Sequence, residues 1–482
     1  MNNSFDIIVI GAGVVGCNIA RELSEYKLNV LALEKDNDVC ARASMANSAI
    51  VHSGYDPVPG TFKARFNVAG NKMFYSLCKR LSVECYQIGS LTIAMDEEQM
   101  KVLHDLEKRA KENGVEVRIV EHDELLKMEP NINQDAKGAL LAPTAGIVDP
   151  FTFCSHNMEN ALDNGVKLHL NEEVVEIKDL KDHFEVKTNI ATYTCKIVIN
   201  AAGHGSYKLG SQLEKLDYKI TPRKGEYFVF DHYAKGLVNH TIFPLPSAKG
   251  KGILVSPTYS GNYIVGPSSE LSESEDHSTD PETLAMVKAG ALEMVPNLPF
   301  NELIRVFAGV RATPSDHDFH IAPLKSHPKF IHLCGIESPG FVSSPAIAEY
   351  VVNELVKPLI KLEKKENYIA NVRPSIETRK MNEVERIKLV KEKPEYGEII
   401  CQCEKISKGE ILDAMSRSDH PHTIKAIKKR CRAGFGKCQG GFCQPLVAKL
   451  ISEYYHIPLN KVNYSKVGSY VVRYPTKGEH HD

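Results

Sequence analysis

The chain has 482 residues, enough for about three domains of ordinary size and for large buried cores. Hydrophobic residues make up 43% and charged residues 25% of it, which is typical of a globular protein. The net charge of −2 gives no electrostatic basis for binding nucleic acid, and no apolar run approaches the ~20 residues of a membrane span. The start lacks the basic segment of a signal peptide, and seven scattered cysteines favour a reducing, cytoplasmic compartment.

A dinucleotide-binding motif is predicted at the start of the chain, over residues 5–34. A short apolar strand ends in a glycine turn, an amphipathic helix follows, and a second apolar strand ends in an acid. In that arrangement Gly11 forms the tight turn, Gly13 lets the backbone approach a pyrophosphate, and Gly16 lets the helix pack close to the strand. Glu34 stands where a carboxylate accepts from a ribose hydroxyl, and the helix N-terminus offers N–H groups to phosphates.

Further elements follow from periodicity and turn residues. Helices are predicted at residues 64–81, 97–113, 150–164 and 281–294, strands at 83–95, 115–120, 195–201 and 303–311, and antiparallel sheet over 218–268. An apolar strand at 330–333 leads through a glycine-bearing turn to a helix predicted from Ser344, as N-cap, to Val356, with Pro345 as its first residue. Residues 358–396 are rich in Lys, Glu and Arg, which predicts a solvated linker.

Several stretches of this body resemble the D-amino-acid-oxidase-like flavoprotein superfamily: the opening unit, NSAIVHSG (47–54), VINAAG (198–203), GVR (309–311) and GIESPGF (335–341). Two more, HSGYDPVPGTFKA (52–64) and GIVDP (146–150), are most similar to its L-2-hydroxyglutarate dehydrogenase/oxidase branch. The anaerobic glycerol-3-phosphate dehydrogenase subunit is a close relation whose architecture matches the whole chain better. The resemblance implies FAD as the dinucleotide. It also implies an α/β (α+β) fold, in which a Rossmann-like FAD-binding domain is interleaved with an antiparallel-sheet substrate domain.

The resemblance implies roles for individual residues along the cofactor. The expected FAD contacts are Gly11, Gly13 and Gly16 at the pyrophosphate, Glu34 at the ribose, Arg42, Ser44, Asn47 and Ser48 along the cofactor, Val174 at the adenine, Gly203 at a strand end, and Gly335 and Gly340 in a turn at the flavin. The helix after that turn would direct N–H groups at the flavin, where they stabilise the negative charge of the reduced ring. The alternative for Val174 is an ordinary strand-core residue, and for the turn a simple cap of the sheet.

The substrate is expected to lie over the flavin, on the antiparallel sheet. Arg311 matches the superfamily's substrate-binding arginine, and a guanidinium offers a planar fork to a carboxylate or phosphate. His52 is expected near the flavin, either as general base on the substrate hydroxyl or as a histidine packed on the cofactor. Arg223 and Lys224 are weaker candidates for a second anion contact, with solvated strand-end charges as the alternative. Glu337 stands where glycerol-3-phosphate enzymes of the superfamily usually carry a lysine, which favours a 2-hydroxy acid.

Five of the twelve cysteines fall between residues 401 and 443. The expected metal ligands are Cys401, Cys403, Cys438 and Cys443, and four thiolates hold either a [2Fe–2S] cluster or zinc. The C-x-C pair is tighter than the usual spacing of a structural zinc site, and nearby glycines can present N–H groups to sulfur. AGFGKCQGGFC resembles the bacterioferritin-associated-ferredoxin-like [2Fe–2S] domain, which implies an iron–sulfur cluster and leaves Cys431 as a spare thiol.

The expected domains follow from these resemblances. An oxidoreductase body spans 1–357, with FAD-binding segments at 1–82, 140–215 and 326–357 and substrate-binding segments at 83–139 and 216–325. A charged linker at 358–396, a [2Fe–2S]-binding domain at 397–460 and a tail at 461–482 complete the chain.

A flavin and an iron–sulfur cluster in one chain imply a dehydrogenase that passes electrons onward. We expect hydride transfer to flavin N5 from a small anionic secondary alcohol, either an L-2-hydroxyglutarate-like acid or sn-glycerol 3-phosphate. The electrons would leave through the cluster to a redox protein or quinone-linked partner, and any membrane contact would be peripheral, through that partner. The alternatives are an amine or amino-acid dehydrogenase, a non-catalytic electron-transfer subunit, and a zinc-bound interaction module in place of the cluster.

Overall fold

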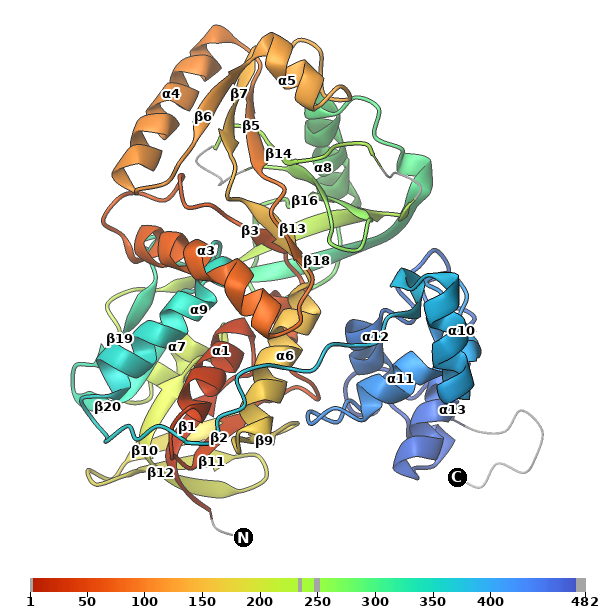
Figure 1. The fold of residues 1–482 in the computed structure, drawn as a ribbon. Coiled ribbons are helices and arrows are strands. Elements are labelled where there is room, and N and C mark those ends of the chain that lie inside the picture. The colour runs from red at the N-terminus through yellow and green to blue at the C-terminus, as the bar shows by residue number, and fades with distance from the viewer. Residues whose placement is uncertain (1–2, 233–235, 247–251, 474–482) are drawn as a thin grey trace. The chain divides into compact units, whose positions relative to one another are not determined.

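The computed structural model describes residues 3–232, 236–246 and 252–473, which form two compact units (Figure 1). The first comprises Met1–Lys35 and Val39–Asn371, and the second Asp36–Asp38 and Val372–Asp482. Of the predicted linker, residues 358–371 belong to the first unit and 372–396 to the second. Residues 474–482 of the predicted tail lie outside the described residues. Within the described residues, no helix has the length and apolar character that crossing a membrane requires.

The first unit contains a mixed eight-stranded sheet centred on β1 (Ser4–Ile10). β1 pairs in parallel with β2 (Val30–Leu33) on one side and β12 (Thr192–Asn200) on the other. The remaining strands are β9 (Lys167–His169), β10 (Val174–Asp179), β11 (Phe184–Thr188), β19 (His320–Leu324) and β20 (His327–Cys334). β2 is wholly buried, as apolar parallel strands covered on both faces are. The Rossmann-like part of the fold prediction is confirmed.

A nine-stranded sheet forms the other main layer of this unit. Its strands are β5 (Ser90–Ala94), β6 (Arg118–Glu121), β7 (Gly138–Ala142), β13 (Ile220–Phe230), β14 (Thr241–Phe243), β15 (Leu254–Pro257), β16 (Tyr263–Gly266), β17 (Glu270–Leu271) and β18 (Leu303–Pro314). Neighbouring strands are antiparallel, as predicted, except that β14 and β5 run parallel. A small antiparallel sheet of β3 (Ile50–Val51), β8 (Gly146–Val148) and β4 (Cys85–Tyr86) is also present.

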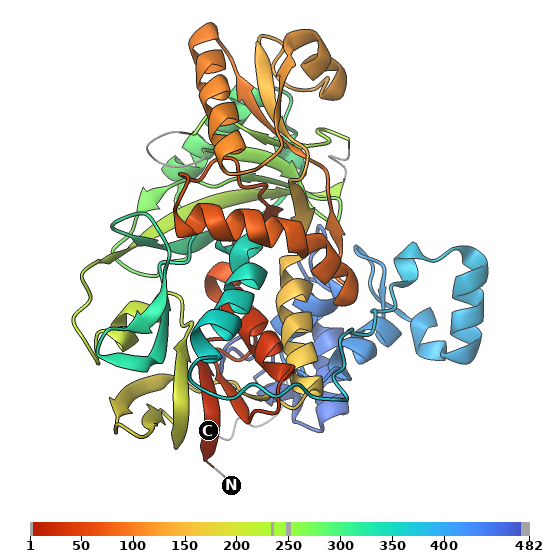
Figure 2. The same ribbon diagram turned by 60° about the vertical axis from the view of Figure 1, so that its left-hand side comes forward.

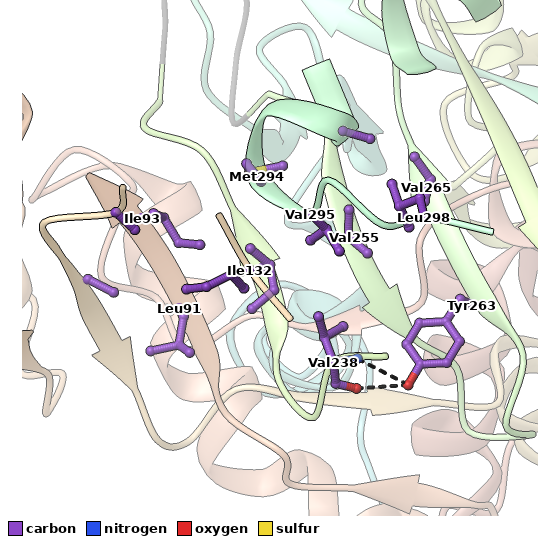
Figure 3. Close-up of a cluster of buried hydrophobic side chains, with 14 of the residues drawn as sticks. Leu91, Ile93, Ile132, Val238, Val255, Tyr263, Val265, Met294, Val295 and Leu298 are labelled. Atoms are coloured by element: carbon purple, nitrogen blue, oxygen red, sulfur yellow. Dashed lines mark hydrogen bonds between the residues drawn. The ribbon is translucent and has the colours of Figure 1, made fainter. Parts of the chain in front are cut away.

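An apolar core lies under the nine-stranded sheet, against α8 (Pro281–Met294) and α5 (His122–Met128) (Figure 3). Leu91, Val255 and Val265 of the sheet pack there with Met294 of the helix. Tyr263 joins them because its hydroxyl donates to the Val238 carbonyl oxygen at 2.9 Å, so the polar end of this buried ring is satisfied.

Helices cover the eight-stranded sheet. α1 (Val14–Ser24), α6 (Pro150–Asp163) and α9 (Gly340–Tyr350) pack side by side, and α3 (Phe62–Arg80) crosses α9 (Figures 1 and 2). Gly70 permits that crossing, since a Cβ there would lie 2.1 Å from the Val342 carbonyl oxygen. Three shorter or peripheral helices are α2 (Arg42–Met45), α4 (Glu97–Glu112) and α7 (Gly205–Gly210). α4 begins at a predicted boundary because Asp96 caps it by accepting from the Gln99 N–H.

The start of the last helix of this unit was predicted wrongly. α9 begins at Gly340, so Ser344 and Pro345 lie inside it, and a π-helical turn, Val351–Val356, continues it. Proline at this position removes the N–H that would bond the carbonyl oxygen of Phe341. Ser344 Oγ donates to that same oxygen at 2.7 Å, which compensates for the missing bond.

The second unit is small and mainly helical. Its regular elements are α10 (Glu383–Glu392), β21 (Ile399–Cys401), β22 (Ile406–Ser407), α11 (Lys408–Met415), α12 (Ile424–Cys431) and α13 (Gln444–Tyr455). α11 has a capping box, in which Ser407 Oγ accepts from the Glu410 N–H and the Glu410 carboxylate accepts from the Ser407 N–H. An apolar core formed by α11, α12 and α13 supports the cysteine-bearing loops.

Candidate active site

One cavity of the first unit, about 1190 Å³ in volume, gathers residues that are far apart in the sequence. It is lined by His52, Arg223 and Arg311 and by every predicted cofactor residue except Gly16. The volume exceeds the ~300–1,000 Å³ of ordinary ligand sites, so there is room for an extended dinucleotide together with a small substrate.

The glycine turn before α1 fits a phosphate cradle. A Cβ on Gly16 would lie 1.9 Å from the Gly11 carbonyl oxygen, so Gly16 lies beneath the turn and lets α1 pack on it. Gly11 has a φ of +99°, and a Cβ there would lie 2.6 Å from the Ala201 carbonyl oxygen. A Cβ on Gly13, the N-cap of α1, would stand 3.1 Å from Ser44 Oγ. The cavity side of the helix N-terminus is therefore kept clear of side chains, as anion binding requires.

Three of the polar residues that are predicted to contact the cofactor also form hydrogen bonds within the protein. Glu34 Oε2 accepts from the Ala12 N–H at 2.7 Å, and Ser44 Oγ accepts from the Val14 N–H at 2.9 Å. Asn47 Nδ2 donates to the Ser44 carbonyl oxygen at 2.8 Å. These bonds fix the wall of the cavity around the glycine turn.

The other predicted cofactor residues continue the wall. Arg42 has a positive φ of +46°, and its guanidinium lies 3.7 Å from Glu275. Val174 begins β10, and Gly203, with a φ of +59°, follows the end of β12. Gly203 therefore lies at the carboxyl end of a parallel strand, in accordance with the rule that ligands bind there, while Val174 lines the cavity from the start of its strand.

The turn before α9 contains an unexpected ion pair. Lys63 of α3 donates to Glu337 at 2.7 Å, and Thr313 of β18 donates to the other carboxylate oxygen at 2.6 Å. All three line the cavity. Glu337 lies in the turn between Gly335, which has a φ of +68°, and Gly340, which starts α9. The negative charge of Glu337 is thus already paired, so it gives no reason to exclude a phosphate ester.

Two arginines face the cavity from adjacent strands. Arg223 of β13 and Arg311 of β18 are direct partners in an antiparallel pair, so their side chains lie on one face of the sheet. Arg311 donates to the Ser268 carbonyl oxygen at 2.8 Å and Arg223 to that of Ser269 at 3.3 Å. Among the described residues, neither guanidinium has a carboxylate partner. Lys224 lies on the opposite face, outside the cavity lining, and pairs with Glu226 at 3.3 Å and with Asp276.

A tyrosine and a glycine place this sheet against the cofactor wall. Gly309 abuts the α2 segment, since a Cβ there would lie 2.0 Å from the Ala46 carbonyl oxygen. Tyr227, four pairs along from the arginines, lines the cavity and bonds to Ser48. Burial raises the pKa of Tyr227, against the opposing effects of the Arg311 guanidinium and Ser48, so the phenol stays protonated as a donor.

His52 lines the cavity and is held through its backbone. Its carbonyl oxygen accepts from Asn67 Nδ2 at 2.7 Å and from Asn71 Nδ2 at 3.1 Å, and Asn71 also donates to the Thr144 carbonyl oxygen. Both asparagines are buried and lie one turn apart on α3. The ring of His52 lies 5.9 Å from that of Phe243, measured between centroids.

Four of the five cysteines of the second unit form two contacting pairs, Cys401 with Cys443 and Cys403 with Cys438. The first pair is buried, while Cys403 is exposed and Cys438 half-buried. Within the described residues, no three His, Cys, Asp or Glu side chains are gathered to hold one metal ion. Two pairs of thiols, one pair for each iron, fit a two-iron cluster.

Backbone N–H groups point at these sulfurs, as the glycines predicted. A hydrogen bond from Cys443 and N–H groups of Glu404 and Gly434 lower the pKa of Cys401. The pKa of Cys438 is also lowered: burial alone would raise it, but hydrogen bonds from the N–H groups of Phe442 and Gly440 outweigh that effect. The pKa values of their partners, Cys403 and Cys443, are raised, so in each pair one thiol is favoured as the thiolate, the form that ligates iron. Burial raises the pKa of Cys431 to about 12, consistent with the prediction that it is a spare thiol.

Sequence reasoning did not single out Lys63, Thr313, Tyr227 or the two asparagines of α3. It gave Arg223 as a weaker candidate, and the structure places Arg223 in the cavity lining. A weak signal existed, because Arg223 and Tyr227 are spaced to share one face of a predicted strand. The others depend on contacts between distant segments that a single sequence does not reveal.

The fold and cavity place the protein in a known class. Residues 6–354 match the family model described as FAD dependent oxidoreductase, and residues 399–453 match that of the BFD-like [2Fe-2S] binding domain. The chain therefore belongs to the FAD-dependent oxidoreductase family, with an appended iron–sulfur domain, and its cofactors are FAD and a [2Fe–2S] cluster.

Individual proteins of known function or structure are similar to this chain. A glycerol 3-phosphate dehydrogenase of Caloramator mitchellensis is 42% identical over 98% of this chain and 99% of its own length. An L-2-hydroxyglutarate dehydrogenase of Arabidopsis thaliana is 28% identical over 73% of this chain and 83% of its own. Among solved structures, FAD-bound L-alpha-glycerophosphate oxidase from Mycoplasma pneumoniae is 31% identical, with a TM-score of 0.74, and covers 77% of this chain and 100% of its own.

Proposed function

We propose that this protein is a glycerol-3-phosphate dehydrogenase that oxidises its substrate in the FAD-containing unit and releases electrons through the [2Fe–2S] cluster. The end-to-end similarity to the Caloramator mitchellensis glycerol 3-phosphate dehydrogenase supports the substrate. The electron acceptor is a redox protein or a quinone-linked partner. The free cysteines of both units suit the reducing compartment that we expect for it.

The arrangement of Arg223 and Arg311 carries the proposal. Like charges directly opposite each other on a sheet destabilise it, and no carboxylate of the described residues offsets them. A phosphate ester carries close to two negative charges on one compact group, and two guanidiniums can bind it through charge-assisted hydrogen bonds. L-2-Hydroxyglutarate also carries two negative charges, but they lie on two separate carboxylates at opposite ends of the molecule.

The other cavity residues are proposed to act in proton transfer and in positioning. His52 accepts the proton of the C2 hydroxyl as the C2 hydride departs, which converts the secondary alcohol to a ketone. FAD, when bound, accepts that hydride, and the cluster passes the two electrons onward singly. Asn67 and Asn71 fix the backbone that carries His52. Cys401, Cys403, Cys438 and Cys443 are the proposed cluster ligands.

An anaerobic spectral titration tests the proposal. Glycerol 3-phosphate should bleach the flavin absorption, while L-2-hydroxyglutarate and glycine at the same concentration should not. Bleaching by L-2-hydroxyglutarate or glycine instead would contradict the proposal that glycerol 3-phosphate is the substrate. Bleaching by dithionite alone would identify a non-catalytic electron-transfer subunit.

A further inference from the structure

The proposed cluster ligands are arranged asymmetrically in the second unit. Cys401 and Cys443 are buried beneath the helices, whereas Cys403 is exposed and Cys438 half-buried. The iron that Cys403 and Cys438 would hold is therefore the one nearer to solvent. Electron transfer between proteins is favoured where the carriers approach closely, so an external partner is expected at this edge.

An apolar surface adjoins that edge. Phe442, directly before Cys443, is 83% exposed, and Leu446, four residues later in the first turn of α13, is 47% exposed. Pro445 between them is exposed as well. A lone exposed apolar side chain is ordinary, but a phenylalanine beside two further apolar residues and an exposed cysteine is the composition of an interface anchor.

Three exposed lysines lie around these residues, and one of them, Lys449, pairs with the exposed Glu453 at 3.7 Å. Lys405, Lys437 and Lys449 are exposed next to Cys403, Cys438 and Leu446 in the sequence. Of the ten Lys and Arg in the matched iron–sulfur segment, residues 399–453, these three are the exposed ones, against a single exposed acid, Glu453. We name the six residues Lys405, Lys437, Phe442, Pro445, Leu446 and Lys449 the cluster-edge surface. Its apolar centre and basic rim complement an acidic partner.

We infer that the cluster-edge surface is the docking site for an acidic one-electron redox protein, which takes electrons at the Cys403 side of the cluster. Phe442 anchors the partner and the lysines orient it. This inference rests on the proposed cluster ligands, but it does not depend on the identity of the substrate.

A matched pair of probes tests the charge requirement. Native cytochrome c is basic, whereas succinylated cytochrome c carries the same haem with its lysines converted to carboxylates. Full-length protein reduced with dithionite should bind the succinylated form more tightly than the native form, and added salt should weaken that binding. Each ferric haem takes one electron from the protein and becomes ferrous, so the rate of haem reduction should follow the same order.

Phe442→Ser should weaken binding of succinylated cytochrome c about tenfold, the effect of losing one anchor residue. Val384→Ser is the matched control, since Val384 is 77% exposed on α10 of the same unit but lies outside the surface, and it should leave binding unchanged. Lys405→Gln with Lys449→Gln should lower the association rate and its salt dependence.

Iron and sulfide content and the electron paramagnetic resonance spectrum of each variant establish that the cluster is intact. Equal binding of both probes, or equal effects of the two serine variants, would overturn the inference. A fall in oligomeric mass caused by Phe442→Ser would overturn it as well, because the surface would then bind a second copy of this chain. Since dithionite supplies the electrons, failure of glycerol 3-phosphate as substrate leaves this test intact.

Discussion

Replacing Arg223 by methionine should weaken binding of glycerol 3-phosphate without disturbing the flavin. The side chain lies opposite Arg311 in the cavity and, among the described residues, forms hydrogen bonds only with Ser269. Its removal therefore leaves no buried carboxylate without a partner. Hydrogen bonds to charged groups contribute about 1.5–3 kcal/mol. The loss of one therefore corresponds to a roughly 10- to 100-fold increase in the dissociation constant.

Stopped-flow flavin reduction at increasing glycerol 3-phosphate measures this effect, because it separates the dissociation constant from the limiting rate. Lys219→Met is the control: Lys219 is exposed just before β13 and does not line the cavity, so its removal should change neither quantity. A dissociation constant for Arg223→Met within twofold of the original would refute the role of the arginine pair. So would equal weakening for glycerol, which has no phosphate.

Three further changes test other parts of the structure. Asn67→Leu removes a donor to the His52 carbonyl oxygen and should slow the limiting rate of flavin reduction about tenfold, with an unchanged dissociation constant in the same assay. Gly16→Ala places a Cβ 1.9 Å from the Gly11 carbonyl oxygen, so the purified protein should lose its flavin absorption yet keep its iron. Burial lowers the pKa of His332 from 6.5 to about 4. As the pH falls through this window the unfolded chain gains the proton first, so the free energy of unfolding should drop by up to about 3 kcal/mol in denaturant titrations, and less in His332→Gln.

The sequence alone predicted those parts of the structure that are formed by residues close together in the chain. The glycine turn and Glu34 lie together because strand, turn and helix are consecutive, and the resemblance to known flavoproteins then extended that motif to the rest of the cavity. The start of α9 was misplaced because a serine–proline pair indicates a helix start, whereas here Ser344 Oγ compensates for the bond that Pro345 removes.

The parts that were not foreseen depend on register and on long-range pairing. Arg223 and Lys224 are adjacent in the sequence, and only the pairing of β13 with β18 shows that Arg223 faces the cavity. Glu337 was interpreted as favouring a 2-hydroxy acid over a phosphate ester, since its partner Lys63 lies on a distant helix. A single sequence contains no signal for such a contact.

The central claim is that one chain both oxidises glycerol 3-phosphate and delivers the electrons to its cluster. The direct measurement adds glycerol 3-phosphate anaerobically to purified protein and follows the visible spectrum and the electron paramagnetic resonance signal of the same sample. The flavin absorption should bleach and the signal of a reduced [2Fe–2S] cluster should appear. Bleaching without a cluster signal in protein that contains iron and sulfide would contradict the claim.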